Sequence, residues 1–195
     1  MGYSIPEYKG THHGPAIVCG SGPTLFDDFT TARRALPGAT IFAVNEAIRA
    51  VRTSHIVTLH TEKALWFRNL ALQAWPNIEP ILHLPINGDF PKEKGIHCWD
   101  KIATAATSAW AAVKLAKLLG HDEVTMCGCP MNGGDGYAFP TEGNKPGEPR
   151  FGFSQRSGVR VHKGALVDAI NNGEAEGVYS MSGFTREVLG APKWL

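Results

Sequence analysis

The chain has 195 residues, a net charge of +1 and a hydrophobic content of 43%, which is typical of one domain with a sizeable core. Its lysines and arginines are scattered along the sequence, so we expect no nucleic-acid partner. No apolar run is long enough to span a bilayer, and the first residues lack the basic and apolar stretches of a signal peptide, so we expect a cytoplasmic protein without a membrane span.

The cysteines and histidines do not indicate a metal site. The four cysteines, Cys19, Cys98, Cys127 and Cys129, follow neither a zinc spacing nor a redox C-x-x-C motif, so we expect reduced thiols that pack as small hydrophobic residues. The histidines form no H-x-x-x-H or H-E-x-x-H arrangement, and no metal is therefore predicted.

Short apolar runs alternate with amphipathic segments along the chain. Strands are predicted at residues 16–19, 40–44, 55–59, 81–84, 123–127 and 177–180, because these runs have the length and composition of buried parallel strands. Helices are predicted at residues 25–36, 45–52, 62–75, 107–119, 161–171 and 184–189. The alternation predicts an α/β fold of the Rossmann-like, doubly wound type, with a mostly parallel sheet and helices on both faces. We expect one nucleotide-binding domain over residues 1–195, with a long loop at 128–160.

Ligands of such sheets bind beyond the carboxyl ends of the strands. The first strand is followed by the glycine-rich loop Gly20, Ser21, Gly22, Pro23 and Thr24, whose glycines let the backbone approach a ligand and whose following helix offers amides to a phosphate. Leu25 replaces the third glycine of the dinucleotide motif, and a plain tight turn explains the loop as well.

Polar residues follow other strands at the same level. Asn45 offers a donor and an acceptor to a base or a sugar, although a helix cap is the alternative. Thr107 and Ser108 open the alanine-rich helix and would form an anion site or simply cap it. For Thr61, which has Glu62 behind it, a capping role is the preferred interpretation.

The long loop and the helix after it carry the residues that would serve chemistry. His162 is the candidate base for an acceptor hydroxyl, and Tyr137 with Arg156 and Arg160 would stabilise a departing phosphate. Solvated surface charge is the alternative interpretation for this group, which also includes Asn132, Asp135, Arg150 and Lys163.

Several short motifs resemble one family. Residues 20–25 are similar to the G-N-G-P-S-L opening of bacterial lipooligosaccharide sialyltransferases, a group that includes archaeal hydroxymethylpterin diphosphokinase-like and flagellin-modifying proteins. Residues 42–45 resemble its C-N segment, 107–109 its T-S-G helix start, 117–124 its A-L-G-Y-K-E-I stretch and 137–139 its S-Y-A-F. Residues 178–180 and 189–192 resemble its C-terminal strand and helix, so the matches span about 175 residues in one order.

The resemblance implies a glycosyltransferase that binds a cytidine nucleotide sugar without metal or other cofactor. The nucleotide would be held by residues 20–24, Asn45, Thr107 and Ser108, and Tyr137 would stabilise the leaving phosphate. Ser21 stands where the family has asparagine, and His162 is several residues out of register with the family's histidine base. The resemblance therefore supports nucleotide binding more strongly than catalysis. Because the chain is too short for a sizeable acceptor lid, we expect a small acceptor, or one supplied by another subunit of a homo-oligomer.

Two alternatives from other classes stay open. A pterin diphosphokinase-like phosphotransfer enzyme would need Mg²⁺, for which Asp27, Asp28, Asp135 and Glu142 are the nearby carboxylates. The chain would otherwise be a non-catalytic module that binds a nucleotide or a protein.

Overall fold

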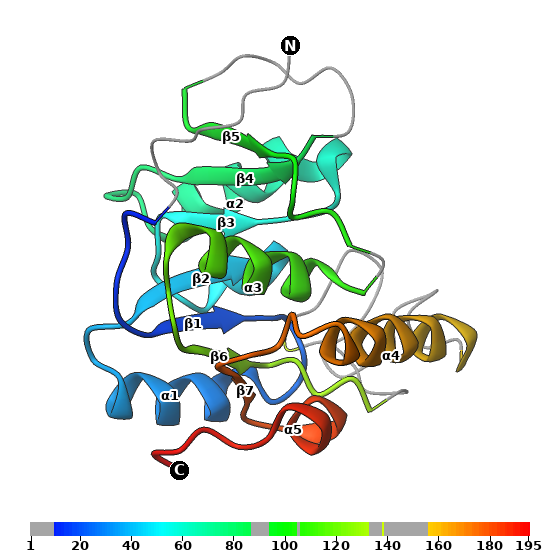
Figure 1. The fold of residues 1–195 in the computed structure, drawn as a ribbon. Coiled ribbons are helices and arrows are strands. Elements are labelled where there is room, and N and C mark those ends of the chain that lie inside the picture. Colours follow the sequence, from blue (N-terminus) through cyan, green and yellow to red (C-terminus); the bar gives the residue numbers. More distant parts are fainter. Residues whose placement is uncertain (1–9, 87–93, 105, 133–137, 139–155) are drawn as a thin grey trace.

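A parallel β-sheet organises the part of the chain that the computed structural model describes, namely residues 10–86, 94–104, 106–132, 138 and 156–195. Within these residues, seven strands follow the order β5-β4-β3-β2-β1-β6-β7, and every neighbouring pair is parallel (Figure 1). Their bounds are β1 Ala16–Cys19, β2 Thr40–Val44, β3 His55–Val57, β4 Ile81–Pro85, β5 Ile96–Trp99, β6 Val124–Cys127 and β7 Val178–Ser180.

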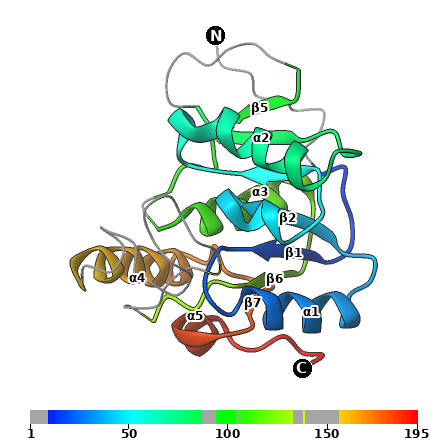
Figure 2. The same cartoon turned by 180° about the vertical axis from the view of Figure 1, so that it is seen from behind.

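Helices cover both faces of the sheet, as the views from opposite sides show (Figure 1 and Figure 2). One face carries α1 (Leu25–Ala35), the short 3₁₀ helix η2 (Asn45–Arg49) and α2 (Ala64–Ala74). The other face carries α3 (Ser108–Leu119) and α4 (Arg156–Asn171). A second 3₁₀ helix, η3 (Thr61–Lys63), precedes α2, and α5 (Gly183–Leu189) follows β7. The predicted α/β doubly wound architecture is thereby confirmed.

Alternate residues of the central strand divide the apolar core into two layers. Ile17 and Cys19 of β1 pack beneath α1 and α2, whereas Ala16 and Val18 pack on the side of α3. All four side chains are fully buried, as the two-sided burial of a parallel strand requires. The apolar run that predicts β1 is therefore continuous because each of its residues meets a helix layer.

Some element boundaries differ from the prediction. The sequence pattern does not predict β5, because Ile96–Trp99 mixes a histidine and a cysteine with two apolar residues and pairs only with β4, at the edge of the sheet. The strand predicted at residues 55–59 ends at Val57. The helix predicted at 62–75 begins as the 3₁₀ turn η3 and becomes α-helical at Ala64.

The helix predicted at residues 161–171 begins five residues earlier, at Arg156. Val159, Leu166 and Ala169 are buried and recur at helical spacing, so the apolar face of α4 extends to the start of the helix despite Gly158. This is a correction to the predicted loop at 128–160, because its last five residues, including Arg156 and Arg160, are helical.

The strand order reverses between β1 and β6. The chain adds β2, β3, β4 and β5 on one side of β1 and then returns to place β6 and β7 on the other. In open α/β sheets, ligands bind at the carboxyl ends of the strands at such a reversal. None of the described helices is both long and apolar enough to cross a membrane.

Candidate functional site at the carboxyl edge of the sheet

The two crossovers that leave β1 and β6 meet where the strand order reverses. The amide of Gly20 donates to the carbonyl oxygen of Cys127 at 2.8 Å, and the amide of Gly22 donates to that of Gly128 at 2.8 Å. A β-carbon on Gly20 would lie 2.5 Å from the Cys129 sulfur, and one on Gly22 would lie 2.6 Å from the Gly128 oxygen. Both positions require glycine because the segment that follows β6 occupies the space of a side chain. Both amides already donate hydrogen bonds within the protein.

A buried carboxylate joins these crossovers to the end of β7. The Oδ2 atom of Asp28 accepts hydrogen bonds from the amide of Gly128 at 2.9 Å, from the hydroxyl of Ser182 at 2.7 Å and from the hydroxyl of Thr24 at 2.8 Å. We call these four residues the Asp28 clasp. Asp28 is 8% exposed, so the three donors replace the water that its carboxylate would otherwise bind.

The Asp28 clasp limits what the glycine-rich loop can bind. The Thr24 hydroxyl is hydrogen-bonded to Asp28, so a phosphate placed against Thr24 would lie beside a negative charge. From the sequence, Asp28 is predicted in the first turn of a helix and, in the phosphotransfer alternative, near a magnesium ion. Its role as an acceptor that joins three loops could not be predicted, because Gly128 and Ser182 lie 100 and 154 residues away along the chain. Three donors at Oδ2 also leave that oxygen unavailable to a metal ion.

Asn45, at the end of β2, has a strained backbone and an unpartnered side-chain oxygen. Its φ is 53°, in the left-handed region that costs free energy for residues other than glycine. Among the described residues, nothing hydrogen-bonds its buried Oδ1, and no side chain caps η2, whose N-cap residue is Val44. The capping alternative for Asn45 is therefore wrong.

Further features of this edge lie next to Asn45 and after β6. The hydroxyl of Ser21 donates to the carbonyl oxygen of Val44 at 3.2 Å, which ties the glycine-rich loop to the end of β2. Met131, which follows β6, has a φ of 51° and is the other described non-glycine residue with a positive φ. Both strained positions thus lie at the carboxyl edge, where backbone strain often accompanies function.

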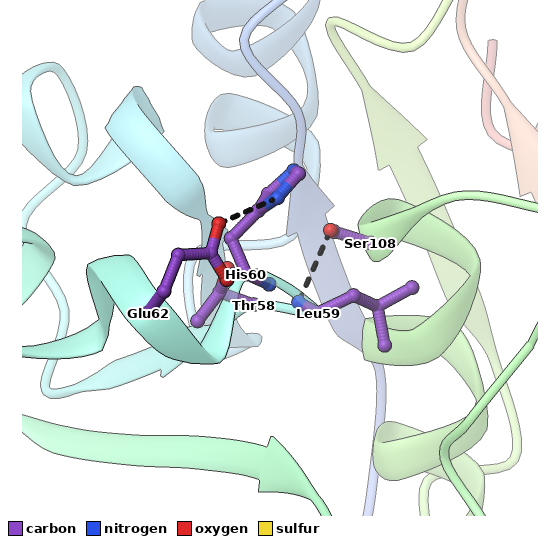
Figure 3. A network of polar contacts seen from close by, with 5 residues as sticks. All are labelled: Thr58, Leu59, His60, Glu62 and Ser108. Atoms are coloured by element: carbon purple, nitrogen blue, oxygen red, sulfur yellow. Dashed lines mark hydrogen bonds and ion pairs between the residues drawn. The ribbon is translucent and has the colours of Figure 1, made fainter. Parts of the chain in front are cut away.

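The hydroxyls at the start of α3 are both used within the protein. Thr107 caps the helix by accepting a hydrogen bond from the amide of Trp110 at 3.2 Å. Ser108 accepts one from the amide of Leu59 at 3.2 Å and so joins α3 to the end of β3 (Figure 3). The capping interpretation of Thr107 is confirmed, and Ser108 positions the polar residues that follow β3.

One of those residues, His60, forms a pair that the sequence analysis did not identify. His60 Nδ1 lies 3.5 Å from Glu62 Oε1, with both side chains at least half exposed (Figure 3). No side chain caps η3, so the capping role predicted for Thr61 is wrong. An imidazole held by a carboxylate at Nδ1 keeps Nε2 for proton transfer. The spacing His-x-Glu directly after a strand was the signal for this pair.

The residues predicted to serve catalysis lie partly outside the described chain. Tyr137, Asp135 and Glu142 are outside the described residues, as is the side chain of Arg156. Arg160 is exposed on α4, and His162 is half-buried one residue before Lys163, whose Nζ lies 4.2 Å above the Phe184 ring of α5. The amide of Ala138 donates to the carbonyl oxygen of Ser21 at 2.9 Å. The residue that follows Tyr137 in the sequence therefore contacts the glycine-rich loop.

The cysteines have the structural role that the sequence predicts. All four are buried and form no disulfide. Burial raises the pKa of Cys129 to about 12 and raises the pKa of Cys19 and Cys127 well above the ordinary thiol value, so these groups stay protonated and unreactive. Among the described residues, no group of three or more histidine, cysteine or acidic side chains could hold a metal ion.

Comparison of the chain with models of known families, with curated proteins and with solved structures gives no match.

The Asp28 clasp generates a stability prediction. Asp28→Ala leaves the Gly128 amide without its acceptor, while the Thr24 and Ser182 hydroxyls, 2.9 Å apart, keep each other as partners, so we expect the free energy of unfolding to fall by about 1–3 kcal/mol. Asp27→Ala is the matched control, because Asp27 is its exposed neighbour in the same first turn and its loss should change stability by less than about 1 kcal/mol. Urea unfolding measures both. Equal effects of the two substitutions would show that the clasp contributes nothing.

Proposed function

We propose that this chain is a glycosyltransferase-like enzyme. It binds a nucleotide sugar of the CMP type at the carboxyl edge of the sheet and transfers the sugar to an acceptor hydroxyl without a metal. The observation that carries the binding half of this proposal is the unpartnered, buried amide oxygen of Asn45 on a strained backbone. The transfer half rests on the family resemblance of the sequence.

Asn45 is better explained by a ligand than by the fold of the free protein. A buried polar atom without a partner costs about 1–3 kcal/mol, and a left-handed conformation adds to that cost. A ligand that donates a hydrogen bond removes the first of these penalties. A nucleoside offers such donors, namely the exocyclic amine of cytosine and the ribose hydroxyls, and Ser21 holds the adjoining backbone in place.

The charges at this edge favour one orientation of the nucleotide. Asp28 and Glu62 are the acidic side chains beside the ends of β1 and β3, and they favour the uncharged nucleoside there. Arg160 and Lys163 lie on α4, and cations of this kind stabilise a phosphate. The phosphate is therefore expected toward α4 rather than against Thr24, with Arg156 at the first position of the same helix.

In the proposed reaction, the sugar moves from the nucleotide phosphate to the acceptor hydroxyl with a histidine of this chain as the base. An imidazole takes the proton of the acceptor hydroxyl, the acceptor oxygen bonds to the anomeric carbon, and the bond from that carbon to the phosphate oxygen breaks. The electron pair leaves with the phosphate, for which Arg156 and Arg160 of α4 and Tyr137 are the candidate stabilising groups. His162 is the first candidate base, and His60, oriented by Glu62, is the second.

A binding experiment tests the role of Asn45. CMP should raise the melting temperature of the wild-type protein, because a ligand that binds only the folded form stabilises it. Asn45→Ala should lose most of this shift, with a rise in Kd of roughly tenfold or more. Asn132→Ala is the matched control, because the Asn132 oxygen already accepts a hydrogen bond from the amide of Phe184 at 2.9 Å; it should lower the melting temperature but keep the CMP shift. A full CMP shift in Asn45→Ala would contradict the proposed contact.

A turnover experiment identifies the base. Incubation with CMP-sugars should release CMP, and His162→Ala should lower kcat by roughly 10²–10⁴-fold while the affinity for CMP is retained. Loss of turnover in His60→Ala and Glu62→Gln instead would transfer the role to that pair. Asn45-dependent binding without any CMP release by the wild type would leave a non-catalytic binding module, and Mg²⁺-dependent transfer from ATP would support the phosphotransfer alternative.

A further inference from the structure

Five histidine rings form a continuous row on the face of the sheet that carries α3. We call His12, His55, His83, His97 and His121 the histidine row. Neighbouring ring centroids are 6.1 Å apart for His12 and His55, 5.5 Å for His12 and His121, 5.3 Å for His55 and His83, and 5.5 Å for His83 and His97. The row begins at the amino ends of β1 and β3 and reaches the middle of β4, because His83 pairs with Val57 and Val57 pairs with Val44. None of the five histidines is among the residues of the proposed nucleotide site.

Hydrogen bonds indicate which nitrogen carries the proton in neutral His83, His55 and His121. The Trp99 indole can only donate, and it lies 3.1 Å from His83 Nδ1, so this nitrogen is an acceptor. The proton of neutral His83 is therefore on Nε2, which donates to His55 Nδ1 at 3.1 Å. It follows that His55 carries its own proton on Nε2. A second proton on either ring would break one bond of this directed chain.

His121 ends the row in the same uncharged state. Its Nδ1 lies 2.9 Å from the carbonyl oxygen of Gly14, which can only accept, so the proton is on Nδ1. The Nε2 atom is buried and has no hydrogen-bond partner in the described part of the chain. Protonation of His121 would place a charged N–H group where nothing accepts it, which is unfavourable in a buried position.

One chain segment, residues 10–14, is attached through this row. The amides of Gly10 and His12 donate to the carbonyl oxygens of Leu118 and Leu119 at 3.1 and 2.8 Å, at the end of α3. The His12 ring lies against both His55 and His121, and Gly14 accepts from His121. The segment therefore lies against the row through the His12 ring and the Gly14 carbonyl, and charge on His55 or His121 would act directly on these contacts.

We infer that the histidine row is an acid-sensitive latch, which holds residues 10–14 on the sheet at neutral pH and releases them when the rings take up protons. Neighbouring imidazoliums at these ring distances would repel each other. The groups that act on the row include His13 on the segment, His97 on β5 and Asp122 beside His121. Phe42 of β2 and Trp99 of β5, which also touch the row, are uncharged.

The direction of the pH effect follows from the folded protein. Burial, followed by the nearby His12, His121 and His97, lowers the pKa of His55 to about 4. Burial lowers the pKa of His83 well below its ordinary value and also lowers that of His121, although the Gly14 carbonyl and Asp122 favour its charged form. Because these pKa values are lower than those of free imidazole, the released state binds more protons. The latch is complete above about pH 7 and weakens as the pH falls from 6.5 toward 4.

Hydrogen exchange of the Gly10 and His12 amides tests the release. After correction for intrinsic exchange, protection of both amides should fall roughly 30-fold between pH 7.5 and pH 5, as expected when release returns the pKa of His55 from about 4 to its ordinary value of 6.5. His55→Asn should flatten this pH dependence because it removes the ring whose protonation drives the release, whereas His13→Gln is the matched control because His13 is exposed and should preserve it. Protection that is independent of pH in the wild-type protein would overturn the inference.

A second measurement needs no variant and therefore does not depend on whether a substituted protein folds. The ¹⁵N chemical shifts of the imidazoles report which nitrogen carries the proton at pH 7.5. We expect the Nε2–H form for His55 and His83 and the Nδ1–H form for His121. An Nδ1–H form of His83 would remove the bond from Trp99 and with it the directed chain on which the latch rests.

Discussion

The buried carboxylate of Asp28 is the constraint on which the carboxyl edge of the sheet depends. It accepts from Thr24 in its own crossover, from Gly128 after β6 and from Ser182 after β7, so one side chain fixes three loops at the point where the strand order reverses. Removal of this acceptor would leave the buried Gly128 amide without a partner, while the Thr24 and Ser182 hydroxyls would keep only each other at 2.9 Å. Gly20 and Gly22 follow from the same constraint, because the second crossover occupies the space where their side chains would be.

This rigid junction permits strain in the residues beside it. Asn45 and Met131 hold left-handed conformations at the ends of β2 and β6, and such conformations persist only where the surroundings determine them. The same junction also changes how an anion can be bound. Two amides of the glycine-rich loop and the Thr24 hydroxyl form hydrogen bonds within the protein. In the proposed complex, the nucleotide would therefore contact this edge through its nucleoside, with the phosphate near the cations of α4.

The fold could be predicted from the sequence because its signals are local. The apolar run at residues 16–19 and the alanine face of the helix after Thr107 are each set by residues that are close in the chain, and the doubly wound sheet follows from their alternation. β5 was not predicted because it lies at the edge of the sheet, where a strand does not require a continuous apolar run. The Asp28 clasp, the His60–Glu62 pair and the histidine row combine residues from different crossovers and strands, and no periodicity in the sequence encodes such combinations. Asn45 was identified as a candidate, but its strain and its unpartnered oxygen become visible only in three dimensions.

Two positive-φ residues, Asn45 and Met131, follow β2 and β6 at the carboxyl edge of the sheet, and the histidine row, of which His83 and His121 are buried, lies on the face that carries α3. Titration of the isotopically labelled protein with CMP, followed by two-dimensional NMR, tests the assignment of the binding site most directly. Saturation should shift the side-chain amide of Asn45 and the backbone amides of Ser21 and Ser108, and leave His55 and His83 unchanged. Unshifted signals of Asn45 at saturating CMP, or changes confined to the histidine row, would contradict the placement of the nucleotide at the carboxyl edge.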